Sequence, residues 1–144
     1  MIIASILKQK GTEVVSVGPE DTVLETARTL TRHSIGAALV RDAEGRILGI
    51  VSERDIIRGM AGHGLGTTQL PVGQLMTRDL VTVTPQTLVV QALAMITHHR
   101  VRHLPVLDGE QLAGLVSIGD LVKARIEEAE HEAEELKAYV VSAG

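Results

Sequence analysis

The chain contains an internal repeat, and this repeat constrains its fold more than any other feature of the sequence. Val15-Ser-Val-Gly-Pro19 resembles Val81-Thr-Val-Thr-Pro85, a shift of 66 residues (85 − 19). One residue is lost at a later turn, after which Gly49 to Asp55 aligns with Gly114 to Asp120 at a shift of 65 (114 − 49). A repeat of this period within 144 residues predicts two copies of one structural unit.

Each copy has the pattern strand, helix, strand, strand, helix, which predicts an α/β (α+β) fold. Short β-branched runs end just before a proline, as strands often do. Apolar residues then recur at i, i+4 and i+7, which is typical of one helix face. Two apolar runs joined by a glycine-containing turn predict a hairpin. The expected elements of the two copies are first strands at 14–17 and 81–83, helices capped by Asp21 and Thr87, hairpins at 37–51 and 104–116, and second helices from Ser52 and Ser117.

The sequence also predicts how the chain is divided. We expect the first copy at 1–62, a glycine-rich linker at 63–71, the second copy at 72–125 and a C-terminal helical extension at 126–144. Two short segments, Ile3 to Leu7 and Val72 to Met76, are expected to lead into the first and the second copy respectively.

A long helix is predicted from Leu121 to Val141. It is rich in glutamate but keeps an apolar periodicity through residues such as Ala129, Ala133 and Leu136. Two interpretations remain open: a solvated helix with one docked apolar stripe, or a helix that packs on a partner subunit.

The pattern Gly-apolar-Val-Ser-x-x-Asp occurs once in each copy, at the predicted junction between the last strand and the second helix. Gly49 to Asp55 is the first signature and Gly114 to Asp120 the second. A serine at this point caps the helix, whose free N–H groups attract anions such as phosphate. A carboxylate one turn later accepts hydrogen bonds from a diol such as that of ribose. Serine and aspartate together therefore predict a minimal grip for a nucleotide.

The same spacing has a purely structural interpretation. Ser-x-x-Asp is close to a capping box, with aspartate in place of glutamate, and duplication of the motif does not exclude this. The surroundings of the two signatures differ. Arg54 belongs to the first signature only, whereas Arg100-Val-Arg-His-Leu-Pro105 precedes a strand of the second copy only. Arginines near a helix start suit phosphate, so the difference predicts two unequal sites.

Composition excludes several classes of protein. A hydrophobic content of 44% with 22% charged residues is typical of a globular chain, and a net charge of −4 provides no general attraction for nucleic acid or anionic lipid. No apolar run approaches the ~20 residues of a membrane helix, and the N-terminus has no signal-peptide pattern, so we expect a cytoplasmic protein. With one Tyr and no Phe or Trp, a nucleotide base would lie between aliphatic side chains and backbone.

Catalytic and metal sites are not predicted. The chain has no cysteine, and His98, His99 and His103 lack a carboxylate at ligand spacing. There is no Gly-x-Ser-x-Gly elbow, no Walker-type loop and no Gly-x-Gly-x-x-Gly after a strand. We therefore expect no catalytic residues, no catalytic cofactor and no enzyme activity.

The doubled signatures and the run His103-Leu-Pro-Val-Leu-Asp108 resemble the cystathionine β-synthase (CBS) domain pair, or Bateman module, of the small stand-alone bacterial type. The resemblance covers about Ile3 to Arg125. It implies two β-α-β-β-α repeats packed with pseudo-twofold symmetry, and clefts between them that hold AMP, ADP, ATP, NAD or S-adenosylmethionine. It also implies a homodimer. The first copy departs from the family pattern at Leu39, where the second copy has Pro105.

The resemblance assigns expected roles to residues of this chain. Ser52 and Ser117 would meet phosphate, Asp55 and Asp120 the ribose, and Ser16 and Thr82 would lie near the base. The expected nucleotide-binding set is completed by Gly36, Ala37, Arg54, Arg102, His103 and Pro105.

We therefore expect a regulatory sensor that binds an adenosyl-containing ligand and signals to a separate effector protein. The alternative is a ligand-free interaction protein acting through its dimer and its acidic C-terminal helix.

Overall fold

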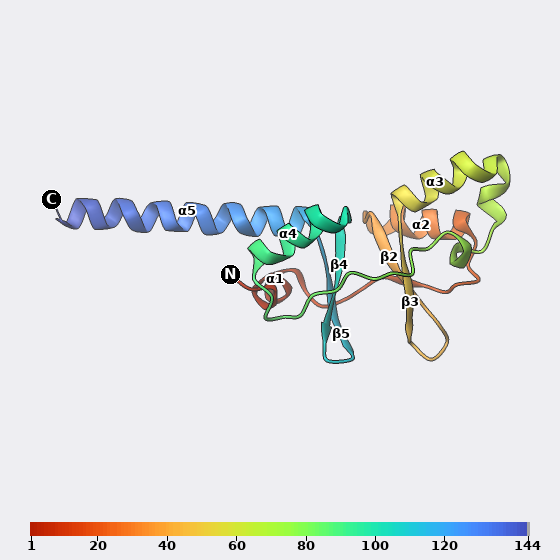
Figure 1. The fold of residues 1–144 in the computed structure, drawn as a ribbon, viewed down its shortest axis with the longest axis horizontal. Helices are drawn as coiled ribbons and strands as arrows, with labels where there is room; N and C mark the ends of the chain where they lie inside the picture. Colours follow the sequence, from red (N-terminus) through yellow and green to blue (C-terminus); the bar gives the residue numbers. More distant parts are fainter. Residues whose placement is uncertain (144) are drawn as a thin grey trace. The chain divides into compact units, whose positions relative to one another are not determined.

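The computed structural model describes residues 1–143, which form two compact units. One unit is Val14–Leu80, and the other combines Met1–Glu13 with the chain from Val81 onward. Each unit contains one copy of the repeat, and the order of elements can be followed in Figure 1. The mixed helix and strand fold is confirmed.

The unit Val14–Leu80 is built on a three-stranded sheet of order β1-β2-β3. β1 pairs parallel with β2, and β2 pairs antiparallel with β3. The core joins Val17, Leu30, Val40 and Val51 from the sheet and α2. Its elements are β1 (Ser16–Val17), α2 (Val23–His33), β2 (Ala37–Arg41), β3 (Ile47–Ser52), α3 (Glu53–His63) and two 3₁₀ helices (Gly64–Gln69 and Val72–Gln74).

The other unit is built on the antiparallel hairpin β4–β5. Its core joins Ile96, Leu104, Val116 and Leu121 from α4, the hairpin and α5. Both hairpins have a register irregularity at the same repeat position, after Val40 or Val106, so the predicted hairpins are confirmed. The elements are α1 (Ile3–Lys10), α4 (Val89–His99), β4 (His103–Asp108), β5 (Gln111–Ser117) and α5 (Ile118–Ala143).

The strand predicted at 81–83 is reduced to an isolated parallel bridge between Val83 and Val106. In the first copy, the amide of Leu39 donates to the carbonyl of Val15 at 3.1 Å. The repeat counterpart of Leu39 is Pro105, which has no N–H to donate. Val83 still donates to the carbonyl of Pro105 and accepts from the amide of Leu107. Pro105 therefore removes one backbone hydrogen bond that the first copy makes at the start of this strand pair.

The predicted N-caps are wrong by one residue. α2 is capped by Thr22, whose hydroxyl accepts from the amide of Glu25, and α4 begins after Leu88. Asp21 and Thr87 instead close the preceding proline turns. The carboxylate of Asp21 accepts from Gly18 N at 2.9 Å, and the hydroxyl of Thr87 accepts from Thr84 N at 3.0 Å. Short polar side chains serve turns as readily as caps.

The two lead segments pack on the opposite copies from those predicted. α1 buries Ile3, Ile6 and Leu7 in the core of the second copy, and Figure 1 shows α1 beside β5 of that unit. Val72 and Met76 are buried in the core of the first copy. A repeat presents two similar apolar surfaces, so the order of segments along the chain cannot determine which surface each segment covers.

The first glycine of each signature allows a close contact with the segment that packs on that copy. A Cβ on Gly49 would lie 2.6 Å from the carbonyl oxygen of Thr77, because Thr77 and Ile50 exchange two backbone hydrogen bonds of 2.8 and 2.9 Å. A Cβ on Gly114 would lie 2.6 Å from Cδ2 of Leu7. The obstacle is backbone in the first copy and a side-chain tip in the second.

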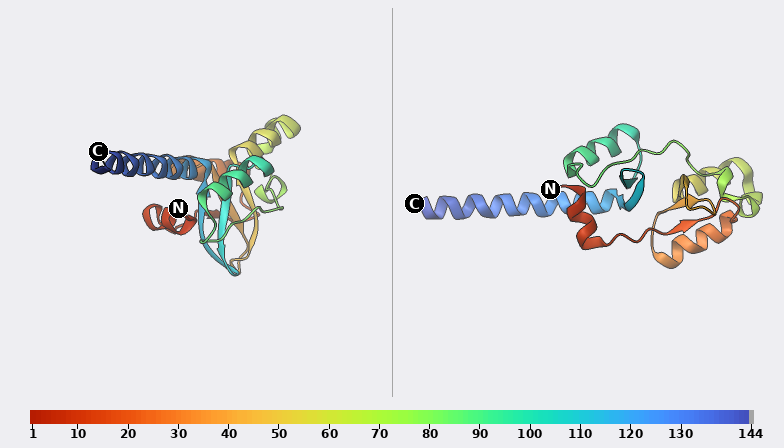
Figure 2. Two further views of the ribbon diagram at one scale, coloured as in Figure 1. Left: turned by 60° about the vertical axis from the view of Figure 1, so that its left-hand side comes forward. Right: turned by 90° about the horizontal axis from the view of Figure 1, so that it is seen from below.

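Within residues 1–143, none of the helices has both the length and the apolar character needed to span a bilayer. This holds for the 26-residue α5 as well. Figure 2 shows that α5 extends far beyond α1, α4, β4 and β5 of its own unit.

The two glycines make a matched pair of substitutions. We expect Gly49→Ala to destabilise the Val14–Leu80 unit by about 1–3 kcal/mol, since a paired backbone carbonyl must move. Gly114→Ala is expected to cost less, because Leu7 can change rotamer. Urea unfolding with amide exchange at Ile50 and Thr77 measures both. An equal or larger loss in Gly114→Ala would contradict this account of the two contacts.

Candidate functional site

Each signature spans the junction that the sequence predicted. β3 ends at Ser52 and α3 starts at Glu53, while β5 ends at Ser117 and α5 starts at Ile118. The serine therefore leaves an extended strand and enters a helix within one residue, and the aspartate lies in the first helical turn.

Serine and aspartate form a reciprocal capping box in both copies. In the first, the hydroxyl of Ser52 accepts from Asp55 N at 3.3 Å, and Oδ2 of Asp55 accepts from Ser52 N at 2.9 Å. In the second, the corresponding distances between Ser117 and Asp120 are 3.1 and 2.9 Å. The structural interpretation of the motif is therefore correct for both signatures, and a ligand would bind to side chains that already cap a helix.

The expectation of several free N–H groups at these helix starts is wrong. The amide of Glu53 donates to the carbonyl of Gly36 at 3.0 Å, and that of Ile118 donates to the carbonyl of Arg102 at 2.8 Å. With the two capping-box bonds, three of the four amides have protein partners. In the hydrogen bonds described for residues 1–143, the amide left without a partner belongs to Arg54 in one copy and Gly119 in the other.

The two aspartates differ in how much of the carboxylate remains available. Asp55 is 6% exposed, and its Oδ1 accepts from the hydroxyl of Thr77 at 3.1 Å and from Nη1 of Arg58 at 3.4 Å. Oδ2 of Asp55 also accepts from the hydroxyl of Ser52. Both oxygens of Asp55 are thus engaged.

Asp120 is more open. Its side chain is 26% exposed, and Oδ2 accepts from Nζ of Lys10 at 2.5 Å as well as from the amide of Ser117. Within the described residues, both of these bonds are made by Oδ2 and neither by Oδ1, and the hydroxyl of Ser117 also hydrogen-bonds to this carboxyl group. A hollow of 220 Å³ lined by α1 and α5 opens beside this carboxylate. The 480 Å³ hollow of the first copy, between α2 and α3, includes Gly36 and Glu53 but not Asp55.

The surroundings of Asp120 also lower the pKa of its carboxyl group. Partial burial by itself raises the pKa of this carboxyl, but the hydrogen bond and charge of Lys10 and the hydrogen bonds from Ser117 outweigh burial. The pKa of Asp120 therefore lies below its ordinary value of 3.8. The carboxylate stays an ionised acceptor throughout the neutral and mildly acidic range.

The remaining predicted residues lie in two groups, one in each unit. Ala37 pairs with Ser52 in the β2–β3 ladder, and His103 pairs with Ser117 in the β4–β5 ladder. Ala37 and Pro105 are buried, Gly36, Thr82 and His103 are half-buried, and Ser16, Arg54 and Arg102 are exposed. Gly36 and Arg102 contact the helix starts through their backbone carbonyls, which accept from Glu53 N and Ile118 N respectively. Ser16 lies on β1 opposite Leu39, and Thr82 lies next to the bridge at Val83.

Three residues that contact the aspartates were not predicted. Arg58, three positions after Asp55 on α3, is one of them, and the other two are distant in the sequence. Thr77 lies 22 positions from Asp55, and Lys10 lies 110 positions from Asp120. Both belong to the segments that pack on the opposite copy, so no local motif connects them with the signatures. The sequence shows only that Thr77 and Lys10 lie next to the two lead segments. That position identifies their partners only when the packing of those segments is known.

The Lys10–Asp120 pair predicts a pH dependence. Because Lys10 lowers the folded-state pKa of Asp120, the pair stabilises the fold fully above the unfolded-state pKa of about 3.9, and the contribution is lost as pH falls through the lower folded-state value. Lys10→Met should cost about 0.5–1 kcal/mol at neutral pH, a range that allows for the solvent exposure of both side chains.

The measurement is urea unfolding of both proteins from pH 7 to pH 2. The difference between Lys10→Met and the parent chain should shrink toward the acid end. Lys8→Met, in the same helix and without an ion pair among the described residues, serves as control. A difference that is constant with pH would exclude the carboxylate as the partner.

Comparison with known proteins shows the family. The CBS domain model matches residues 9–62 and 72–127, which together are most of the chain. The mitochondrial CBS domain-containing protein CBSX3 of Arabidopsis thaliana is 36% identical over 96% of this chain and 71% of its own length.

Solved structures agree. A CBS-domain containing protein of Agrobacterium tumefaciens superposes with a TM-score of 0.85 and 42% identity, covering 86% of this chain and 92% of that one. A putative signal-transduction protein with CBS domains from Burkholderia ambifaria gives a TM-score of 0.83 and 38% identity, covering 88% and 95%. CBS-domain pairs are in general regulatory, signal-transduction modules rather than catalytic ones. With one match in each copy of its repeat, this chain belongs to the CBS domain family as a CBS-domain pair.

Proposed function

We propose that the chain is a ligand sensor that binds an adenosyl-containing small molecule through its Ser-x-x-Asp signatures. The observation that carries this proposal is Oδ1 of Asp120, which accepts neither from Lys10 nor from the amide of Ser117 and lies in the same helical turn as the unpartnered amide of Gly119. These groups offer an acceptor for a ribose diol and one donor for an anionic or polar group, without breaking the capping box.

The ligand class is supported by a distant relative of the same fold. A CBS-domain pair solved in complex with 5′-methylthioadenosine and S-adenosyl-L-methionine superposes with a TM-score of 0.77, covering 89% of this chain. Its identity of 19% establishes a common fold alone, and the ligands are those of that protein. The shared adenosyl group is the chemistry that we carry over to this chain.

The choice among adenosyl compounds depends on the arginines. Arg54 and Arg102 are exposed beside the two signatures, and guanidinium groups favour phosphate over a sulfonium. We therefore propose AMP, ADP, ATP or NAD ahead of S-adenosylmethionine. The rest of the proposed nucleotide-binding set lies near the base and along the cleft walls. Near the base we propose Ser16 and Thr82, and along the walls Gly36, Ala37, His103 and Pro105.

We propose that the two sites have unequal affinities and that the second is the stronger. A diol can reach Asp120 directly, whereas at Asp55 it must first displace the hydroxyl of Thr77 or the guanidinium of Arg58. Breaking a hydrogen bond to a charged group costs about 1.5–3 kcal/mol, so the first site should bind about ten- to a hundredfold more weakly.

We further propose that the module acts in the cytoplasm as a homodimer and passes its signal to a separate effector protein. A sensor of this kind works only if the ligand binds one arrangement of the protein more tightly than another. The alternative function, a ligand-free interaction protein, is favoured by the capping boxes, which account for both signatures without any ligand.

Calorimetry with AMP, ADP, ATP, NAD and S-adenosylmethionine tests the proposal. We expect Asp120→Asn to weaken the tighter binding event by about tenfold or more, since the amide replaces an ionised acceptor. Asp55→Asn, the matched substitution in the other copy, should leave that event unchanged. Absence of binding at millimolar ligand, with both variants folded, would establish the interaction-protein alternative.

Because both oxygens of Asp55 are engaged, a substitution that frees one of them should strengthen ligand binding instead of weakening it. Thr77→Val removes the hydroxyl that occupies Oδ1 and nearly keeps the volume of the side chain. We expect tighter binding at the weaker site, seen as a second resolved event in the same titration. Thr68→Val, in the preceding 3₁₀ helix, is the control because, among the described residues, the hydroxyl of Thr68 donates only to the carbonyl of Leu65. Unchanged weak-site affinity in Thr77→Val would show that Thr77 does not limit access.

A further inference from the structure

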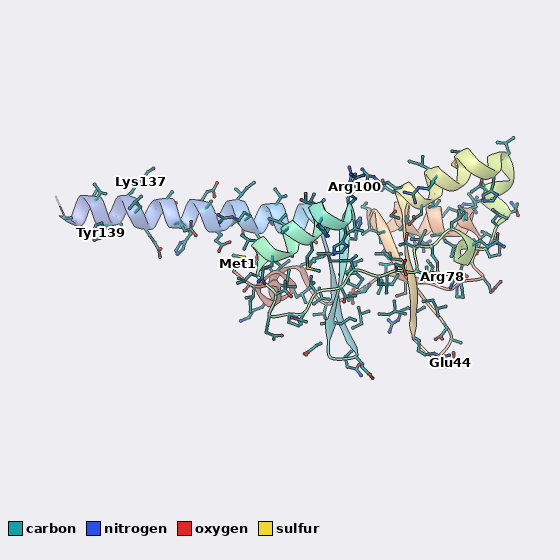
Figure 3. All side chains as sticks on the ribbon, viewed as in Figure 1. Met1, Glu44, Arg78, Arg100, Lys137 and Tyr139 are labelled. Atoms are coloured by element: carbon teal, nitrogen blue, oxygen red, sulfur yellow. The ribbon has the colours of Figure 1, made fainter. Side chains whose placement is uncertain are left out.

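The C-terminal part of α5 has no partner within its own unit. α5 contains 26 residues, which corresponds to about 39 Å, yet its buried residues are only Leu121 and Ala124 near the start. Every residue from Ala129 to Ala143 is exposed. Figure 3 shows the side chains of Lys137 and Tyr139 on this free part of the helix, away from the rest of the unit. A helix that projects into water gains little from local propensity alone.

The exposed part carries a heptad repeat. Apolar residues follow one another at spacings of 4, 3, 4, 3 and 4, which is the a/d pattern of a coiled coil rather than the wider stripe of a helix docked on a domain. The larger members are well exposed: Val122 42%, Ile126 53%, Leu136 65% and Val140 61%. The six seam positions are Val122, Ile126, Ala129, Ala133, Leu136 and Val140.

The seam is distinct from the face that holds α5 to its unit. Leu121 and Ala124, the buried residues, fall outside the seam positions. The glutamates at 127, 128, 134 and 135 occupy the outer b and c positions, so the acidic character of the helix does not lie on the seam. β-branched Ile126 and Val140 at a positions, with Leu136 at a d position, favour two strands.

The flanking charges identify the partner as a second copy in parallel orientation. The charged g positions are Arg125 and Glu132, and the e positions five residues later are Glu130 and Lys137. In a parallel, in-register pair, each g residue meets the e residue of the other helix, so both contacts join opposite charges.

The antiparallel arrangement that aligns the same six seam positions opposes like charges. It places Lys123 opposite Lys137, and Glu130 and Glu132 each opposite their own counterparts. Like charges across a seam are unfavourable and select against this orientation.

We infer that two copies of this chain associate through a parallel, two-stranded coiled coil formed by residues 122–140 of α5. This surface lies outside both signatures. The two alanine layers, Ala129 and Ala133, bury little apolar area, so the coiled coil is weak by itself and is sensitive to single changes at Leu136.

The absence of cysteine from the chain makes a direct test available. Ala129→Cys places one thiol at a d position, where a parallel pair brings the two sulfurs together, whereas the antiparallel pair would bring residue 129 opposite residue 133. In the whole chain of residues 1–144 under mild oxidation, Ala129→Cys should form a disulfide dimer about tenfold or more faster than Glu134→Cys at an outer position, because the seam raises the effective concentration of the thiols.

Two further variants connect the crosslink with the seam. Leu136→Glu added to Ala129→Cys should abolish the faster rate, whereas Val141→Glu, which adds the same charge to an exposed outer position nearby, should preserve it. Equal rates for Ala129→Cys and Glu134→Cys would overturn the inference. Crosslinking that requires a mixture of Ala129→Cys and Ala133→Cys chains would overturn the parallel orientation.

The charge assignment is tested by reversal and rescue. Glu132→Lys places lysine against Lys137 of the other copy and should slow the crosslink of Ala129→Cys. Adding Lys137→Glu restores opposite charges and should restore the rate. A double variant as slow as the single one would overturn the assignment of these g and e positions.

Discussion

The capping box between serine and aspartate holds each repeat together at its most demanding point, where a strand becomes a helix without an intervening loop. The helix start leaves amides that need acceptors, and three of the four find them in the serine, the aspartate and the carbonyl of the residue just before the neighbouring strand. The aspartate also receives the segment that packs from elsewhere in the chain, through Thr77 or Lys10. Strand, helix and lead segment therefore meet at one carboxylate in each copy.

The duplicated unit is less symmetrical than its motif. Asp55 is sealed by two side chains, while Asp120 keeps one oxygen available beside a single lysine. On the strand side, Pro105 removes a hydrogen bond that Leu39 makes in the first copy. These differences arise from residues outside the Ser-x-x-Asp spacing. The two copies can therefore offer a ligand different carboxylate environments while both keep the capping box.

α5 serves two structural purposes along its length. Its first turns carry the second signature and are anchored by Leu121 and Ala124, and its free part presents a seam to a second copy. A change in the first turns, such as a ligand that engages Asp120, acts on the same rigid helix that carries the seam. Helical continuity over 26 residues thus provides a physical link between the proposed ligand site and the proposed coiled coil.

The repeat, the order of the helices and hairpins with their turns, and the position of each signature at a strand–helix junction were all determined by the sequence. Each depends on neighbours a few residues apart: alternation, helical period, turn glycines and a cap. Tertiary structure decided what depends on distant partners. It placed α1 on the second copy and Val72 and Met76 on the first, because both copies offer similar apolar surfaces and only three-dimensional packing selects between them. It also decided which aspartate is open, since Thr77 and Lys10 reach the carboxylates through that exchange.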